Sequence, residues 1–147
     1  MDKPQFVYVT YIATTPEKVW NALMDSKMTR QYWQHDNVSD WKPGSRWEHR
    51  RIPEEKLDIV GKVVEVHPPK RLVISWAFPA DENRPERFSR VTFEIEPHRG
   101  VVKLTVVHDQ LEPGSDMEKG ITRGWPMVLS SLKTLLERGE ALPTLWH

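Results

Sequence analysis

The strongest hydrophobic pattern of the chain lies near its C-terminal end, between Gly114 and Gly139. Apolar residues recur there at steps of three and four, the period of one helical face. They are Met117, Ile121, Trp125, Val128, Leu129, Leu132, Leu135 and Leu136. The pattern predicts a long amphipathic helix over about 115–138, followed by a tail at 139–147. A stripe of this length must be buried against a wide partner, which we expect to be a sheet.

Apolar and polar residues alternate in most segments upstream of this helix, a pattern typical of strands with one covered face and one exposed face. The predicted strands are Phe6–Ile12, Arg46–Arg50, Asp58–Val66, Arg71–Phe78, Ser89–Glu96 and Val101–His108. Turns rich in proline and glycine separate the later strands, so we expect an antiparallel meander of about six strands. Gly61 lies inside one strand and is a candidate β-bulge.

Two short helices are predicted between the first two strands. Thr15, Pro16 and Glu17 form a typical helix start, and the first helix should run to about Met24. A second helix is expected over 26–32. The following segment, 33–44, has the composition of a loop, although Trp33 and Trp41 should hold it against an apolar surface.

The predicted fold class is therefore α+β. We expect a single domain, residues 1–147, in which a curved antiparallel sheet carries two short helices and a long C-terminal helix packed across it.

Charge and composition exclude several classes of function. Lysine plus arginine equals aspartate plus glutamate, 21 each, so no overall field draws the chain to nucleic acid or to an anionic membrane. No apolar run approaches the ~20 residues that cross a bilayer, and no signal peptide is recognisable, so we expect a cytoplasmic protein that does not insert into membranes. There is no cysteine, which removes thiolate chemistry and disulfides. The sequence leaves open a monomer or a homodimer.

Two glycines and a proline mark the first half of the long helix. Gly120 and Gly124 each cost about 1 kcal/mol relative to alanine inside a helix. One interpretation is a close approach of the helix backbone to the sheet or to a ligand near Trp125. The other is a helix that starts late, near Ile121, with Pro126 in an early turn. Both can hold together, and we then expect a less regular first half, around Trp125, that meets the ligand.

A strongly curved sheet under a long helix can enclose a cavity. The residues predicted to line it, with Trp33 at its mouth, are Trp33, Trp47, His49, Trp76, Phe78, Phe93, His108, Trp125, Val128 and Leu129. Ordinary core packing predicts the same inward pattern, so both interpretations stay open for each residue.

His49 and His108 are the candidate acid–base groups, because histidine titrates near neutral pH and both fall on inward strand positions. An inward histidine is more often a hydrogen-bonded core or pocket residue, and no nucleophile elbow, phosphate-binding glycine loop or metal-binding helix motif is present. The six histidines lack the spacing of metal ligands. We therefore assign no catalytic residue and expect no metal and no cofactor.

Several separated motifs resemble a known family. They are Trp33, Ser39–Ser45, Gly61–Val66 with Pro68, Pro69 and Leu72, Ser89–Phe93, Leu104–His108, Gly124 with Trp125, and Leu132–Glu137. Together they resemble bacterial proteins of the Hsp90-ATPase-activator-like family, within the START/Bet v 1-like (SRPBCC) helix-grip superfamily. The resemblance covers essentially the whole chain and implies the helix-grip fold. Because that superfamily includes lipid carriers, hormone receptors and cyclases, the resemblance implies a range of functions.

Three hypotheses follow. The first is binding of a small hydrophobic molecule, aromatic or lipid-like, between the long helix and the sheet. The alternative is a protein-interaction module with an apolar groove, resembling a co-chaperone. The third is an enzyme similar to the cyclases, with His49 or His108 as general base. A closed cavity favours the first, an open apolar patch the second, and a polar pocket with a perturbed histidine the third.

Overall fold

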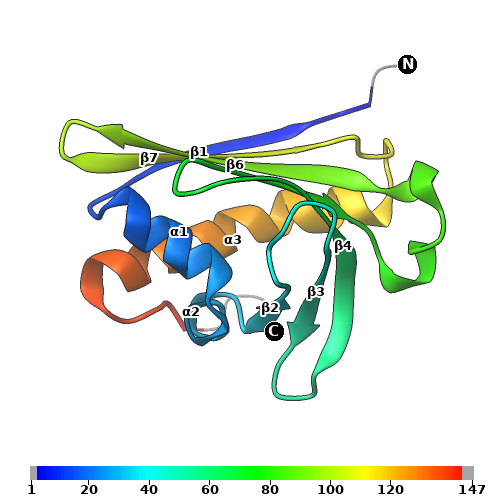
Figure 1. Ribbon diagram of the computed structural model, residues 1–147, viewed down its shortest axis with the longest axis horizontal. Helices are drawn as coiled ribbons and strands as arrows, with labels where there is room; N and C mark the ends of the chain where they lie inside the picture. Colours follow the sequence, from blue (N-terminus) through cyan, green and yellow to red (C-terminus); the bar gives the residue numbers. More distant parts are fainter. Residues whose placement is uncertain (1–2, 144–147) are drawn as a thin grey trace.

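Seven strands and three α-helices make up the fold in the computed structural model, which describes residues 3–143 (Figure 1). In chain order the elements are β1 (Phe6–Ile12), α1 (Pro16–Met24), α2 (Ser26–Tyr32), β2 (His35–Val38), β3 (Arg46–Arg51), β4 (Lys56–His67), β5 (Arg71–Trp76), the short 3-10 turns η1 (Pro79–Asp81) and η2 (Pro85–Arg87), β6 (Ser89–His98), β7 (Val101–Asp109) and α3 (Asp116–Arg138).

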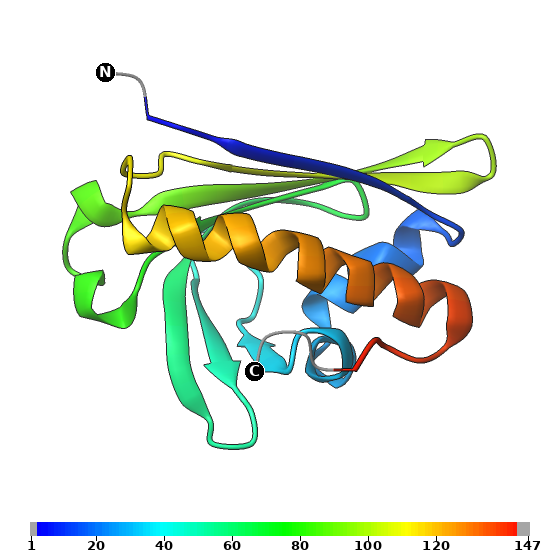
Figure 2. The ribbon, with the colours of Figure 1, turned by 180° about the vertical axis from the view of Figure 1, so that it is seen from behind.

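All strands belong to one antiparallel sheet in the order β1-β7-β6-β5-β4-β3-β2. The meander runs from β2 to β7, and β1 adds to the far side of β7. The helix α3 lies along one face of the curled sheet, with α1 and α2 on the same side (Figures 1 and 2). The predicted α+β class and the long helix packed across an antiparallel sheet are confirmed.

The helix α3 has a defined start and a defined end. At its start, Ser115 Oγ accepts a hydrogen bond from the backbone N–H of Glu118 (3.1 Å). At its end, Gly139 adopts a left-handed conformation with φ 85°, and its N–H donates to Leu135 O (2.8 Å). In its second half Leu129, Leu132 and Leu135 are buried in the core.

The expectation of a late or irregular start to this helix is wrong. The helix is continuous from Asp116 through Pro126. Ile121 and Trp125, one turn apart, are both buried against the sheet. Burial of these two large side chains offsets the backbone hydrogen bond that Pro126 cannot make.

Segment 33–44, predicted to be a loop, contains the strand β2, which brings the sheet to seven strands rather than about six. Its residues His35, Asp36 and Asn37 are buried although they are polar. They pair in register with β3, His35 opposite Arg51 and Asn37 opposite His49. Tertiary pairing therefore overrides a composition that is typical of turns.

Phe78 and Gly61 differ from their predicted roles. The strand β5 ends at Trp76, so Phe78 lies outside it and is 40% exposed instead of facing inward. Gly61 pairs directly with Trp47, and the register of β4 with β5 shifts after Val63 instead. A Cβ atom at Gly61 would lie 1.8 Å from Ser75 O, so the position needs glycine for a close approach between strands.

Candidate functional site

Aromatic rings fill the space between α3 and the sheet. Trp76 on β5 is the centre of this aromatic cluster. Its ring centroid lies 5.4 Å from that of Trp47 on β3, 5.6 Å from that of Trp125 on α3, and 6.4 Å from that of Trp33 at the end of α2. The remaining members of the cluster are His49, His108 and Phe93. These separations are typical of favourable aromatic pairs, so the cluster is a well-packed unit.

A chain of hydrogen bonds runs through the cluster from the helix to the sheet. Trp125 Nε1 donates to His108 Nδ1 (3.0 Å), and Ser89 Oγ donates to Trp76 O (3.0 Å). His108 Nε2 lies 2.8 Å from Ser89 Oγ. Because the hydroxyl hydrogen of Ser89 is used, Nε2 must carry the imidazole hydrogen and donate it. His108 is therefore held neutral, with its single lone pair already occupied by Trp125.

Burial stabilises this neutral state by lowering the pKa of His108 to about 3. A general base needs a free lone pair and a pKa near the working pH. His108 has neither, so its geometry is that of a positioning residue that orients Trp125.

His49 forms a second polar contact at the edge of the cluster. Its Nδ1 lies 2.5 Å from Asn37 Oδ1, to which it donates, and its ring stacks on that of His35 with centroids 3.9 Å apart. His35 in turn contacts Trp33 O (2.7 Å) and Asp58 Oδ2 (2.8 Å). Burial, followed by the positive charges of His35 and Arg51, holds the pKa of His49 well below its usual range.

A small recess remains beside the cluster, along the first half of α3. Its volume is about 110 Å³, and it is lined by Trp33, Trp76, Gly120, Ile121, Gly124, Trp125 and Val128. Gly120 and Gly124 border the recess without a side chain. A Cβ atom built on either glycine would meet no other atom within 4 Å, so the space beside them is open. The apolar recess is therefore reached from the helix side, past Gly120 and Gly124.

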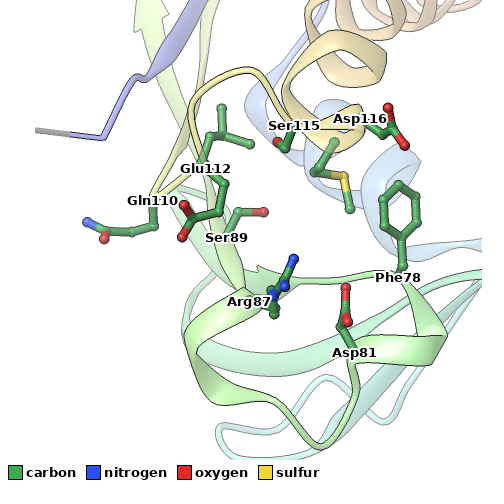
Figure 3. A pocket seen from close by; sticks show the side chains of 10 residues that line it. Phe78, Asp81, Arg87, Ser89, Gln110, Glu112, Ser115 and Asp116 are labelled. Carbon is green, nitrogen blue, oxygen red and sulfur yellow. The ribbon is translucent and has the colours of Figure 1, made fainter. Parts of the chain in front are cut away.

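A second, more polar pocket of about 240 Å³ lies at the start of α3 (Figure 3). Phe78 and Met117 both line it, and Arg87 points into it. The acidic residues Asp81, Glu112 and Asp116 also line it. Met117 connects this pocket to the cluster, since its sulfur accepts a hydrogen bond from Trp76 Nε1 (3.2 Å).

The structure brings nine of the ten residues predicted to line a cavity into the buried interior between α3 and the sheet. They are Trp33, Trp47, His49, Trp76, Phe93, His108, Trp125, Val128 and Leu129. Phe78 is the exception and lies on the outer pocket. Only Trp33, Trp76, Trp125 and Val128 of the nine also border the recess. The other five pack within the core.

Sequence reasoning missed the polar partners of the two histidines. Ser89 and Asn37 bind the rings of His108 and His49. Neither carries a signal in the sequence, because serine and asparagine are common at strand ends and in turns. The two helix glycines did carry a signal, since glycine inside a helix requires an explanation.

Residues 3–143 contain neither a metal-binding cluster nor a membrane-spanning helix. Within this range no group of three or more histidine, aspartate or glutamate side chains is arranged to hold a metal ion. No helix there is both long enough and apolar enough to cross a membrane.

Comparisons with known proteins agree with this architecture. A family model described as activator of Hsp90 ATPase homolog 1-like protein matches residues 13–137. The Aha1 dimer from Colwellia psychrerythraea has a TM-score of 0.78 at 22% identity, over 94% of this chain and 99% of that chain. A Mesorhizobium loti protein has a TM-score of 0.78 at 24% identity, over 93% and 99%.

An HSP90 activator from Plasmodium falciparum has a TM-score of 0.73 at 22% identity, over 90% of this chain and 95% of that chain. At these identities the likeness to solved structures shows the fold alone. A comparison with curated proteins finds no match.

Proposed function

The chain belongs to the family of activator of Hsp90 ATPase homolog 1-like proteins, and from this premise we propose that it binds a small aromatic molecule in the recess beside Gly120 and Gly124. The family's helix-grip architecture places a long helix over a curled sheet, the usual place for a ligand in such folds. The recess lies at that position and has an apolar lining. The occupant is a flat hydrocarbon ring, alone or as the end of a larger lipid-like molecule.

The apolar, tryptophan-rich lining of the recess carries this proposal. Its volume of about 110 Å³ is somewhat smaller than the ~150 Å³ apolar cavities that bind benzene. Trp33, Trp76 and Trp125 offer ring faces and edges to an aromatic guest, and such contacts contribute about 0.5–1.5 kcal/mol each beyond burial. A single ring held in this way should bind with a dissociation constant of about 0.1–1 mM.

Catalysis receives less support from the same geometry. The lone pair of His108 is taken by Trp125 Nε1, and burial lowers the pKa of His49 far below neutral pH. Both histidines are suited to orient neighbouring groups in a dry interior. We therefore propose binding without covalent chemistry.

A thermal-shift experiment with toluene tests the proposal. At ten times its dissociation constant a ligand stabilises the folded protein by about 1.4 kcal/mol, which raises the melting temperature by about 3–5 °C. Gly124→Leu places a side chain in the recess and should abolish the shift. Thr122→Leu adds the same side chain on the exposed face of α3 and should leave the shift intact.

Two results contradict the proposal. One is a melting temperature that toluene does not raise in the unmodified protein. The other is an equal loss of the shift in Gly124→Leu and Thr122→Leu, which would show that binding does not depend on the recess.

A protein partner is the second candidate, because the recess opens at the surface instead of being enclosed. An opening beside two glycines can admit one aromatic side chain of another protein, in the manner of a hot-spot pocket. The family description and the HSP90 activator from Plasmodium falciparum are consistent with this role. A peptide carrying an exposed phenylalanine that competes with toluene, and binds at least tenfold more tightly, would favour it over the small molecule.

A further inference from the structure

The strand β1 forms one edge of the sheet and lacks the features that usually protect such an edge. Its sequence, Phe-Val-Tyr-Val-Thr-Tyr-Ile, contains no charged residue and no proline. It pairs with β7 without a bulge from Phe6 to Ile12. In residues 3–143 no other strand pairs with its outer side. An uncharged edge of seven residues without a bulge is a template for another strand.

The side chains on the outer face of β1 are also uncovered. Val7 is 48% exposed and Val9 is 45% exposed. The alternating residues Phe6 and Tyr8 point to the other face and pack against the core. Val7 stands opposite Val107 on β7, so the apolar surface extends from the edge onto the next strand. The exposed Val7 and Val9 can add cross-strand apolar contacts to a strand that pairs with this edge.

The opposite edge of the sheet shows how this protein protects a strand that remains unpaired. The strand β2 has only four residues, and they include His35, Asp36 and Asn37. The helix α2 lies beside it, and Arg30 on that helix binds Asp36 through two hydrogen bonds of 2.5 and 2.8 Å. Short length, polar side chains and a covering helix all discourage further pairing at β2.

We propose that β1 pairs antiparallel with β1 of a second copy of the chain, about a two-fold axis near Tyr8. This inference does not rest on the proposed ligand. A second copy can pair with this edge because β1 carries no charged residue. Two β1 strands side by side therefore place no like charges opposite each other. At the C-terminal end of β1, Lys133 Nζ donates to Tyr11 O (2.7 Å), which leaves Phe6–Thr10 as the free stretch. Centring the axis at Tyr8 uses this stretch and places Val7 opposite Val9 of the second copy.

Paired substitutions test both the surface and the register. Val7→Lys combined with Val9→Lys places like charges opposite each other twice and should weaken dimerisation at least tenfold. Val7→Lys combined with Val9→Glu places opposite charges across the same two positions and should restore it. Val64→Lys, at another exposed strand valine far along the sheet, is the matched control and should have no effect.

Sedimentation velocity from about 1 to 500 µM measures the outcome. The unmodified chain should dimerise with a dissociation constant of about 10–100 µM, as expected of a small interface. In hydrogen exchange, the β1 amides that face away from β7 should become protected as concentration rises. The proposal is overturned if the unmodified chain is monomeric at 500 µM, if the two-lysine variant dimerises normally, if the lysine–glutamate variant fails to recover, or if assembly continues past the dimer.

Discussion

The sheet side and the helix side of the aromatic cluster use glycine in opposite ways. On the sheet side, a Cβ atom at Gly61 would meet Ser75 O at 1.8 Å and Trp47 Nε1 at 2.5 Å. On the helix side, a Cβ atom at Gly120 or Gly124 would meet nothing within 4 Å. Gly61 allows β4, β5 and the Trp47 ring to pack in direct contact. Gly120 and Gly124 leave the space beside the helix unfilled. The cluster is thus closed toward the sheet and open toward the helix.

This difference indicates which side of the molecule is available for binding. Trp47 Nε1 donates to Ser75 O (2.8 Å), so the sheet side is fixed by a hydrogen bond as well as by packing. On the helix side each glycine lowers helix stability by about 1 kcal/mol without a packing gain in the free protein. A ligand that fills the recess would supply the missing contacts.

The largest expected effect is that of Gly61→Ala. The new methyl group has no room, so β4 and β5 must separate and the hydrogen bond from Trp47 must break. We expect a loss of at least about 3 kcal/mol in the free energy of unfolding, measured by urea denaturation. A variant as stable as the unmodified protein would contradict the closed sheet side.

The pH dependence of stability should show an intermediate effect. The pKa of His108 is about 3 in the folded state, against about 6.5 when unfolded, and burial lowers that of His49 in the same direction. Below pH 6.5 the unfolded chain therefore binds more protons than the folded one. Stability should fall as pH decreases from 6.5 toward 3, by up to about 1.4 kcal/mol per pH unit for each histidine.

His108→Gln isolates its share of that dependence. Urea denaturation at pH 7, 6 and 5 should give a shallower decline in this variant than in the unmodified protein. His67→Gln, the same substitution at an exposed histidine, is the matched control for the change of residue type. Equal slopes in the His108 variant and the unmodified protein would contradict a His108 held neutral by burial.

The smallest expected effect is that of Gly124→Ala, and its sign is opposite to that at Gly61. The methyl group points into open space and improves helix propensity, so the free protein should gain about 0.5–1 kcal/mol. The same methyl group narrows the recess and should weaken toluene binding several-fold. Calorimetric melting and a toluene titration check the two effects, and a destabilised variant would contradict an open helix side.

Much of the fold could be predicted because most elements follow strong local patterns. The stripe from Met117 to Leu136 predicted α3 almost to the residue, and Thr15 with Pro16 marked the start of α1. Alternation also placed Trp47, His49, Trp76 and His108 on inward positions, where the structure has them. In these segments the local preference and the tertiary packing agree.

The rest depends on contacts between distant segments. The polar strand β2 forms only because β3 pairs with it and α2 covers it. Phe78 lies beyond the end of β5 and is the N-cap residue of η1, which begins at Pro79, and there it is exposed. Whether the aromatic residues between α3 and the sheet enclose a cavity or pack as a cluster depends on how strongly the sheet curves, which the alternation of apolar and polar residues does not encode. Part of the predicted tail, residues 144–147, lies outside the described residues.

The most direct test of a ligand recess on the helix side is a toluene titration of ¹⁵N-labelled protein, followed by the indole N–H resonances of its tryptophans. A ligand in the recess should cause saturable shifts for Trp125 and Trp76, which border it, and a much smaller change for Trp20, which lies on α1. Binding in the recess would be contradicted if the resonances of Trp125 and Trp76 did not move, or if Trp20 shifted as strongly as they did.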